Sequence, residues 1–235
     1  MQTYINPQLS DWSTLTSRPT KEVQDLQKIV LDVFGKIQNE KDQALIDFTE
    51  QFDKVRLTSL EVSIEEIEEA KSLISDDLKQ AIQLAASNIE KFHAVQQEAT
   101  KVIETTKGVN CWRESRGIEN VGIYIPGGTA PLFSTTLMLG IPAKLAGCEN
   151  IILCTPPNKQ GKIHPAILYT ANLIGIEKIY KGGGIQAIGA LTFGTETIQK
   201  VDKIFGPGNQ YVTAAKQTAQ NFGVAIDMPA GPSEV

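Results

Sequence analysis

The segment from Ile176 to Gly194 reads IEKIYKGGGIQAIGALTFG. It begins with a short β-branched run, passes through three consecutive glycines and ends in an apolar stretch of helical character. A strand that turns through glycines into a helix is the repeating unit of parallel sheets. The segment therefore predicts an α/β fold, and the chain on both sides of it continues the same alternation.

Five short runs of strand character occur between residue 121 and the end of the chain. They are Val121–Ile125, Ile151–Thr155, Ile176–Tyr180, Lys203–Phe205 and Val224–Ile226. The stretches between them have helical character and are Ser134–Gly147, His164–Ile174, Ile185–Phe193 and Asn209–Phe222. This alternation predicts parallel strands joined by right-handed crossovers. Ligands bind at the carboxyl ends of such strands, so we expect the functional residues in the loops there.

The chain before residue 120 has a different character, with few glycines and dense charge. Its apolar spacing predicts helices, followed by a hairpin around residues 107–120. An amphipathic helix is predicted over Lys21–Gln38, and Asn39 with Asp42 could cap a second helix whose inner face is Ala44, Leu45, Phe48 and Phe52. Ser63 and Glu66 form a predicted capping box. A long helix is predicted from Asp76 to about Thr105, with the apolar set Leu78, Ile82, Leu84, Ala85, Ile89, Phe92 and Val95. Glu65, Glu66, Glu68 and Glu69 are expected to form a solvated acidic helix face.

Composition excludes several classes of protein. The 235 residues carry a net charge of −5, which disfavours nucleic acid and anionic membrane surfaces as partners. Cys111, Cys148 and Cys154 lack C-x-x-C spacing, so neither a disulfide framework nor a zinc finger is expected. The start of the chain has no secretory pattern, and no apolar run is long enough to span a membrane.

Four glycine- or proline-rich loops are candidate binding elements. They are Tyr124–Ala130, Lys181–Gly189, Phe205–Val212 and Asp227–Glu234. Each loop could let a backbone approach a ligand, and each could equally be a structural turn or, at Asn209, a helix cap. The second loop lies between a strand and a helix but matches neither G-x-G-x-x-G nor the P-loop pattern.

Other reactive residue types have contexts typical of structural roles. His164 precedes Pro165 at a predicted helix start, and His93 lies within a helix without a second ligand at metal-binding spacing. Cys148 and Cys154 have apolar neighbours and are expected in the core. The sequence therefore offers neither a catalytic base, an activated cysteine nor a metal cluster, and we predict no catalytic or metal-binding residue within the chain.

The four loops, in this order, resemble those of histidinol dehydrogenases. The matching segments are Tyr124-Ile-Pro-Gly-Gly, Gly182-Gly-Gly-Ile-Gln-Ala-Ile-Gly-Ala-Leu, Gly206-Pro-Gly-Asn-Gln-Tyr-Val and Asp227-Met-Pro-Ala-Gly-Pro-Ser-Glu. The resemblance extends from about residue 20 to Val235 and is strongest from Val121 onward. It implies a cytoplasmic enzyme that oxidises L-histidinol to L-histidine in two steps, using two NAD and a zinc ion.

The resemblance also implies roles for individual residues and a domain plan. Tyr124, Gln186 and Asn209 match positions that contact NAD, and Ser233 matches a position that contacts the substrate. The family forms homodimers of incomplete Rossmann-like units with an overall likeness to aldehyde dehydrogenases. We therefore expect an N-terminal arm over residues 1–20, the helical first half of a split domain over 21–120, ending in a hairpin, and a Rossmann-like α/β domain over 121–235.

One departure from the family pattern concerns the catalytic groups. In the family, the zinc ligands and the Glu-His pair for proton transfer follow the Ala-Gly-Pro-Ser-Glu segment, and this sequence ends one residue after Glu234. We therefore expect a fragment or truncated chain with little or no activity alone. Two alternatives remain open: a non-catalytic α/β module that binds a nucleotide or a partner, and an aldehyde-dehydrogenase-like enzyme with an activated cysteine.

Overall fold

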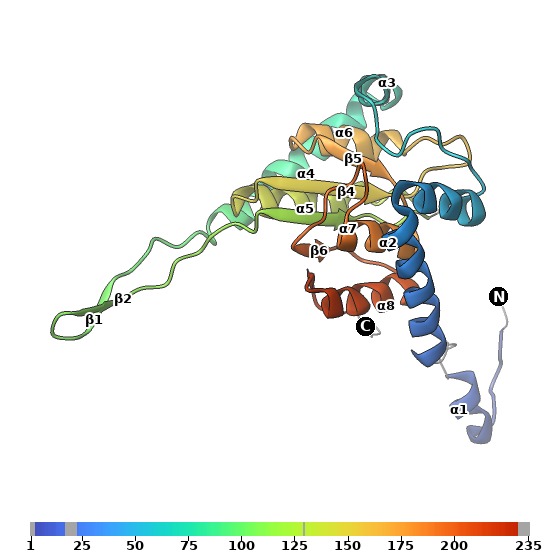
Figure 1. The fold of residues 1–235 in the computed structure, drawn as a ribbon, viewed down its shortest axis with the longest axis horizontal. Helices are drawn as coiled ribbons and strands as arrows, with labels where there is room; N and C mark the ends of the chain where they lie inside the picture. The colour runs from blue at the N-terminus through green and yellow to red at the C-terminus, as the bar shows by residue number, and fades with distance from the viewer. Residues whose placement is uncertain (1–2, 17–22, 129, 230–235) are drawn as a thin grey trace.

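The computed structural model describes residues 3–16, 23–128 and 130–229, and Figure 1 shows their arrangement. Ser233 and the second half of the Asp227–Glu234 loop lie outside the described residues. The first described segment contains a 3-10 turn, η1 (Leu9–Asp11), and the short helix α1 (Trp12–Leu15). Both lie near the N-terminal end of α2, away from the sheet (Figure 1).

A five-stranded sheet forms the centre of the molecule, and all of its strand pairs are parallel. Its strands are β3 (Asn120–Tyr124), β4 (Asn150–Thr155), β5 (Lys178–Lys181), β6 (Lys203–Phe205) and β7 (Ala225–Ile226). Their order is β5-β4-β3-β6-β7. This is the doubly wound Rossmann order without a sixth strand. Successive strands are added toward one edge from β3 to β5 and toward the other edge from β6 to β7, so the topological switch point lies between β3 and β6. The predicted α/β fold with an incomplete Rossmann-like sheet is confirmed.

Helices cover both faces of the sheet. They are α5 (Phe133–Leu145) and α6 (Pro165–Leu173) on one face, and α7 (Gly184–Phe193) and α8 (Gln210–Ala219), extended by the 3-10 turn η2 (Gln220–Phe222), on the other. Ile151 and Leu153 of β4 belong to the core on the α6 side, whereas Ile152 and Cys154 belong to the core on the α7 side. Because successive strand side chains point to opposite faces, a strand buried on both sides is apolar throughout.

The N-terminal helices add an outer layer to each side. The helix α2 (Val23–Asp53) packs against α7 and α8, whereas α3 (Ile64–Leu73) contacts α6 and α4 (Asp76–Ala94) contacts α5. Lys41 has non-helical backbone angles (φ 51°, ψ −121°) and divides α2 into two arms. The predicted change of helix near Asn39 and Asp42 is therefore confirmed.

Two predictions for the N-terminal half are wrong in their boundaries. The helix α4 ends at Ala94 and not near Thr105, and the hairpin consists of β1 (Ile103–Thr106) and β2 (Val109–Cys111). It turns at Gly108, whose positive φ of 87° suits a tight turn, and projects from the body as an arm (Figure 1).

The apolar pattern also overstated how much of these helices is buried. Leu84, Phe92 and Val95 of the predicted inner set are exposed, as is Phe52. These side chains of α4 are exposed because α4 packs on α5 along one side only, the side that carries Ile82.

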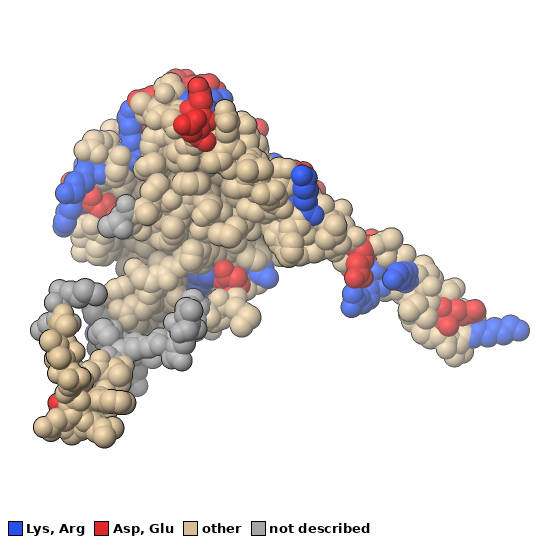
Figure 2. All heavy atoms as spheres, turned by 180° about the vertical axis from the view of Figure 1, so that it is seen from behind, with Lys and Arg blue, Asp and Glu red and all other residues tan. Residues whose placement is uncertain are grey.

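One face of the molecule carries few charges at its centre. In Figure 2, Lys, Arg, Asp and Glu side chains lie mainly near the edges of the body and along the hairpin arm, with both signs in each place. No helix among the described residues is long and apolar enough to cross a membrane.

Candidate functional site

A cleft opens at the carboxyl ends of β3, β4 and β5, where the sheet topology places ligand sites. Its volume is about 830 Å³, within the range of roughly 300–1,000 Å³ usual for small-molecule sites. Three of the four predicted loops contribute to it, through Tyr124, Gln186 and Asn209 among others. Segments far apart in the sequence thus meet at the carboxyl ends of the strands, where the predicted parallel sheet led us to expect the functional loops.

Tyr124 joins two of these loops. It ends β3, is only 3% exposed, and its hydroxyl oxygen accepts a hydrogen bond from the backbone N–H of Gly184 at 3.0 Å. Burial raises the pKa of Tyr124 to about 12, so the phenol keeps its proton at neutral pH. Since the oxygen is the acceptor toward Gly184, the hydroxyl proton is available to a ligand.

Gln186 lies in the first turn of α7, on the floor of the same cleft. Its side chain is buried, and no described residue is a hydrogen-bond partner of its amide. The preceding loop packs tightly against the end of β4: a Cβ at Gly183 would lie 2.6 Å from Cβ of Pro156. Only glycine permits this approach, which brings the start of α7 to the cleft.

Asn209 is the N-cap of α8. Its Oδ1 accepts hydrogen bonds from the backbone N–H groups of Tyr211 at 3.0 Å and Val212 at 3.2 Å. The cap interpretation of this residue is confirmed. The same side chain borders the cleft, so capping and contact with a ligand are compatible.

The glycine turn before Asn209 is held from both sides by a buried ion pair. The N–H of Gly206 donates to Oδ2 of Asp227 at 2.9 Å, and its carbonyl accepts from Nζ of Lys216 at 2.7 Å. Lys216 and Asp227 also form an ion pair with each other. Sequence reasoning missed Lys216, because a lysine on a surface helix normally faces water.

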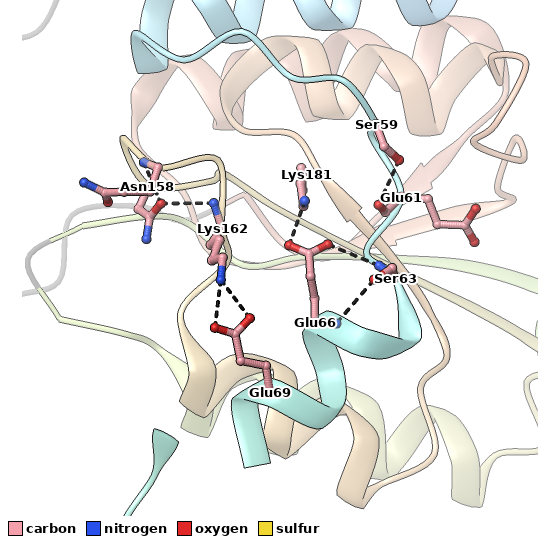
Figure 3. A network of polar contacts seen from close by, with 9 residues as sticks. Ser59, Glu61, Ser63, Glu66, Glu69, Asn158, Lys162 and Lys181 are labelled. Carbon is pink, nitrogen blue, oxygen red and sulfur yellow. Dashed lines mark hydrogen bonds and ion pairs between the residues drawn. The ribbon is translucent and has the colours of Figure 1, made fainter. Parts of the chain in front are cut away.

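A second polar network anchors the strand that leads into the Gly182–Gly184 loop (Figure 3). Lys181 Nζ lies 2.8 Å from Oε1 of Glu66, and Glu66 forms the predicted capping box with Ser63 at the start of α3. The prediction that Glu66 is solvated is wrong, because its carboxylate turns inward to this buried lysine. On the neighbouring loop Lys162 pairs with Glu69.

The opposite wall of the cleft comes from the N-terminal helices, and sequence reasoning missed it. Phe52 and Asp53, at the end of α2, border the cleft, as does His164. Nδ1 of His164 accepts a hydrogen bond from the N–H of Ala166 at 3.2 Å, which makes it the N-cap of α6. Its position at a helix start was predicted, but its place in the cleft was not.

The cysteines show no sign of activation. Cys154 is fully buried, and burial raises the pKa of its thiol to about 12. A core role for Cys154 is thus confirmed, and Cys148 packs partly buried against the same side of the sheet as α6. Cys111 is exposed on the hairpin. Within the described ranges no group of three His, Cys, Asp or Glu residues could hold a metal ion.

Comparison with known proteins gives a consistent result. The histidinol dehydrogenase family profile matches residues 16–235. The chain is 56% identical over 229 residues to histidinol dehydrogenase of Bacteroides thetaiotaomicron, a match that covers 97% of this chain. It is 51% identical over 244 residues to that of Pasteurella multocida, covering 100% of this chain.

A crystal structure of histidinol dehydrogenase from Elizabethkingia anophelis is similar to the chain in fold and sequence. The TM-score is 0.89 with 73% identity, over 99% of this chain and 54% of that one. The curated relatives are likewise matched over 54% and 55% of their lengths. The chain therefore spans about half the length of these proteins.

Proposed function

The chain belongs to the histidinol dehydrogenase family, and we propose that it supplies the NAD-binding part of an enzyme that oxidises L-histidinol to L-histidine. The observation that carries the proposal is the convergence of Tyr124, Gln186 and Asn209 on one cleft. These residues lie 62 and 23 positions apart in the sequence (186 − 124 and 209 − 186). A common position at the sheet edge is what a dinucleotide site in this topology requires.

The described residues fit a dinucleotide. The cleft has room for one, and its lining offers three polar side chains: the protonated Tyr124 hydroxyl, the Gln186 amide and the Asn209 amide. When bound, NAD would supply the hydride acceptor for each oxidation step. The residues of this chain would bind and orient it, since none of the three is suited to remove a proton at neutral pH.

Substrate binding and zinc binding concern residues other than those that line the cleft. We propose that Ser233 contacts L-histidinol, although it lies outside the described residues. The part of the chain that the structure describes contains no group of three His, Cys, Asp or Glu residues that could hold zinc. We also propose that the whole protein is a cytoplasmic homodimer. Two further proposals are a division into two domains near residue 120 and an overall likeness to aldehyde dehydrogenases.

Calorimetric titration of the 235-residue chain with NAD tests the proposal. We expect saturable binding, weakened about tenfold when Gln186→Ala removes one hydrogen-bonding amide from the buried floor. Gln217→Ala, on the exposed side of α8, is the matched control and should bind like the parent. Absence of NAD binding by the folded parent chain would refute the proposed function.

A turnover assay separates the enzyme from a non-catalytic binding module. The assay contains the 235-residue chain with L-histidinol, NAD and zinc. NAD binding without NADH formation is the result expected for a module or for one part of an enzyme. Robust NADH formation would contradict the prediction that this chain has little activity alone.

A further inference from the structure

Asp53 borders the cleft from the helical wall, and one oxygen of its carboxylate has no hydrogen-bond partner among the described residues. Its Oδ2 is buried, and no described residue donates a hydrogen bond to it. Desolvation raises the pKa of this carboxyl above its ordinary value. Buried polar atoms are almost always hydrogen-bonded in folded proteins, so an unpaired buried oxygen on an aspartate that lines a cleft requires an explanation.

The sequence neighbours of Asp53 do not form an ion pair with it, and its electrostatic contact is with the Tyr124 phenol, which is neutral at neutral pH. Asp53 is the last residue of α2, where the negative end of the helix dipole disfavours an acid. The cations nearest in sequence are engaged elsewhere: Lys54 Nζ donates to the carbonyl of Gln51 at 2.7 Å, and Arg56 pairs with Glu50. Asp53 therefore opposes folding in the ligand-free chain, which is typical of residues kept for binding.

An apolar surface lies beside this carboxylate. Phe52 is 54% exposed, borders the cleft and stacks on Phe48 with ring centroids 5.8 Å apart and planes inclined by 7°. Ile29 also borders the cleft and is partly exposed. A free aromatic face next to an acceptor-only carboxylate suits a nucleoside, whose base is flat and apolar and whose ribose presents two adjacent hydroxyl donors.

The sheet itself offers no acid for this purpose. In doubly wound folds the carboxylate that binds the ribose follows the second strand of the unit. Here that strand is β4, and the residues after it are Pro156, Pro157 and Asn158. The unpaired carboxylate of the cleft comes instead from α2, on the opposite wall.

We infer that Asp53 accepts hydrogen bonds from the adenosine ribose diol of a bound dinucleotide, with the base against Phe52. The inference rests on the proposed function and names the residue that selects the cofactor. A phosphate on the 2′-hydroxyl would bring two negative charges against the carboxylate and would remove one donor. The cleft therefore discriminates against NADP through Asp53.

Calorimetry with NAD and NADP on the parent chain and on Asp53→Asn tests the inference. We expect the parent to prefer NAD, and Asp53→Asn to weaken NAD binding about tenfold while reducing the preference over NADP by at least the same factor. Asp32→Asn, an exposed position on the same helix, is the control and should change neither value. Thermal melting should show Asp53→Asn to be at least as stable as the parent, whereas a merely structural aspartate would lose stability.

The outcomes are distinguishable. If Asp53→Asn leaves both the NAD affinity and the NAD to NADP ratio unchanged, the inference is wrong while the proposed function stands. If Asp53→Asn does not fold, the affinity of the parent chain for NAD that lacks the 2′-hydroxyl of the adenosine ribose is measured instead. Weaker binding of this analogue than of NAD supports the ribose contact, and equal binding overturns it. If the parent binds no NAD, the proposed function fails and the inference fails with it.

Discussion

The two walls of the cleft differ in how their polar groups are satisfied. On the sheet wall, the Tyr124 hydroxyl accepts a hydrogen bond from Gly184 and Asn209 caps α8. Behind this wall, Lys216 and Asp227 hold the backbone of Gly206 in the turn that leads to Asn209. On the helical wall, the carboxylate of Asp53 has an oxygen that is buried without a partner. Most of these polar groups on the sheet side are thus satisfied within the protein, with the buried Gln186 amide as an exception, whereas the helical wall is left with an unpaired acceptor.

This difference indicates that one wall contributes mainly to stability and the other mainly to ligand binding. The hydrogen bonds from Gly184 to Tyr124 and from Gly206 to Asp227 join separate segments, so they hold the loops in position and contribute to folding. On the other wall, the Asp53 carboxylate with its unpaired oxygen costs stability and, by the inference above, gains hydrogen bonds when a ligand binds. Substitutions on the sheet wall should therefore lower stability, and removal of the acid on the helical wall should raise it.

The largest effect is expected from Gly206→Ala on the sheet wall. Gly206 has a φ of 138°, and a Cβ there would lie 2.1 Å from the carbonyl oxygen of Tyr124. We expect a loss of about 4 kcal/mol in the free energy of unfolding, from overpacking and backbone strain together. Urea denaturation measures it, with Gly128→Ala as control because a Cβ there meets nothing within 4 Å. Equal stability of the two variants would show that the sheet wall is not tightly packed.

Lys216→Met should have an intermediate effect. It leaves the carboxylate of Asp227 and the carbonyl of Gly206 without their buried cation, whose side chain is 7% exposed. We expect a loss of about 2 kcal/mol, below the usual cost of breaking a buried pair because Asp227 is partly solvated. The double variant Lys216→Met/Asp227→Asn should recover part of this loss in the same denaturation experiment. No recovery would mean that the ion pair does not account for the contribution of Lys216.

The smallest effect is the pH dependence of stability at Asp53. Its folded-state pKa is raised by desolvation, so ionisation destabilises the folded chain. The stability that Asp53 contributes is present below its ordinary pKa of 3.8 and is lost as pH rises through the higher folded-state pKa. The melting temperature of Asp53→Asn should therefore exceed that of the parent at neutral pH, and the difference should vanish on acidification. A difference that stays constant with pH would show that the Asp53 charge is not the cause.

Local patterns predicted much of the fold and part of the site. The succession of strands and helices along the chain and the capping box at Ser63 followed from residue spacing. The choice of Tyr124, Gln186 and Asn209 came from the resemblance to histidinol dehydrogenases, and the topology of parallel sheets explains why all three line one cleft. The end of α4 was missed because its apolar spacing continues beyond the part that packs on α5. The burial of Glu66 was missed because its partner, Lys181, is 115 positions away (181 − 66).

The order of residues alone was sufficient for features that depend on near neighbours: helical and strand periodicity, caps, and glycines after the strands. Tertiary structure alone brought the end of α2 to the cleft, with Phe52 and Asp53 facing the sheet loops, and joined Lys216 to Asp227. The physical reason is that a local pattern specifies which face of an element is apolar, whereas the partner of that face depends on how distant elements pack.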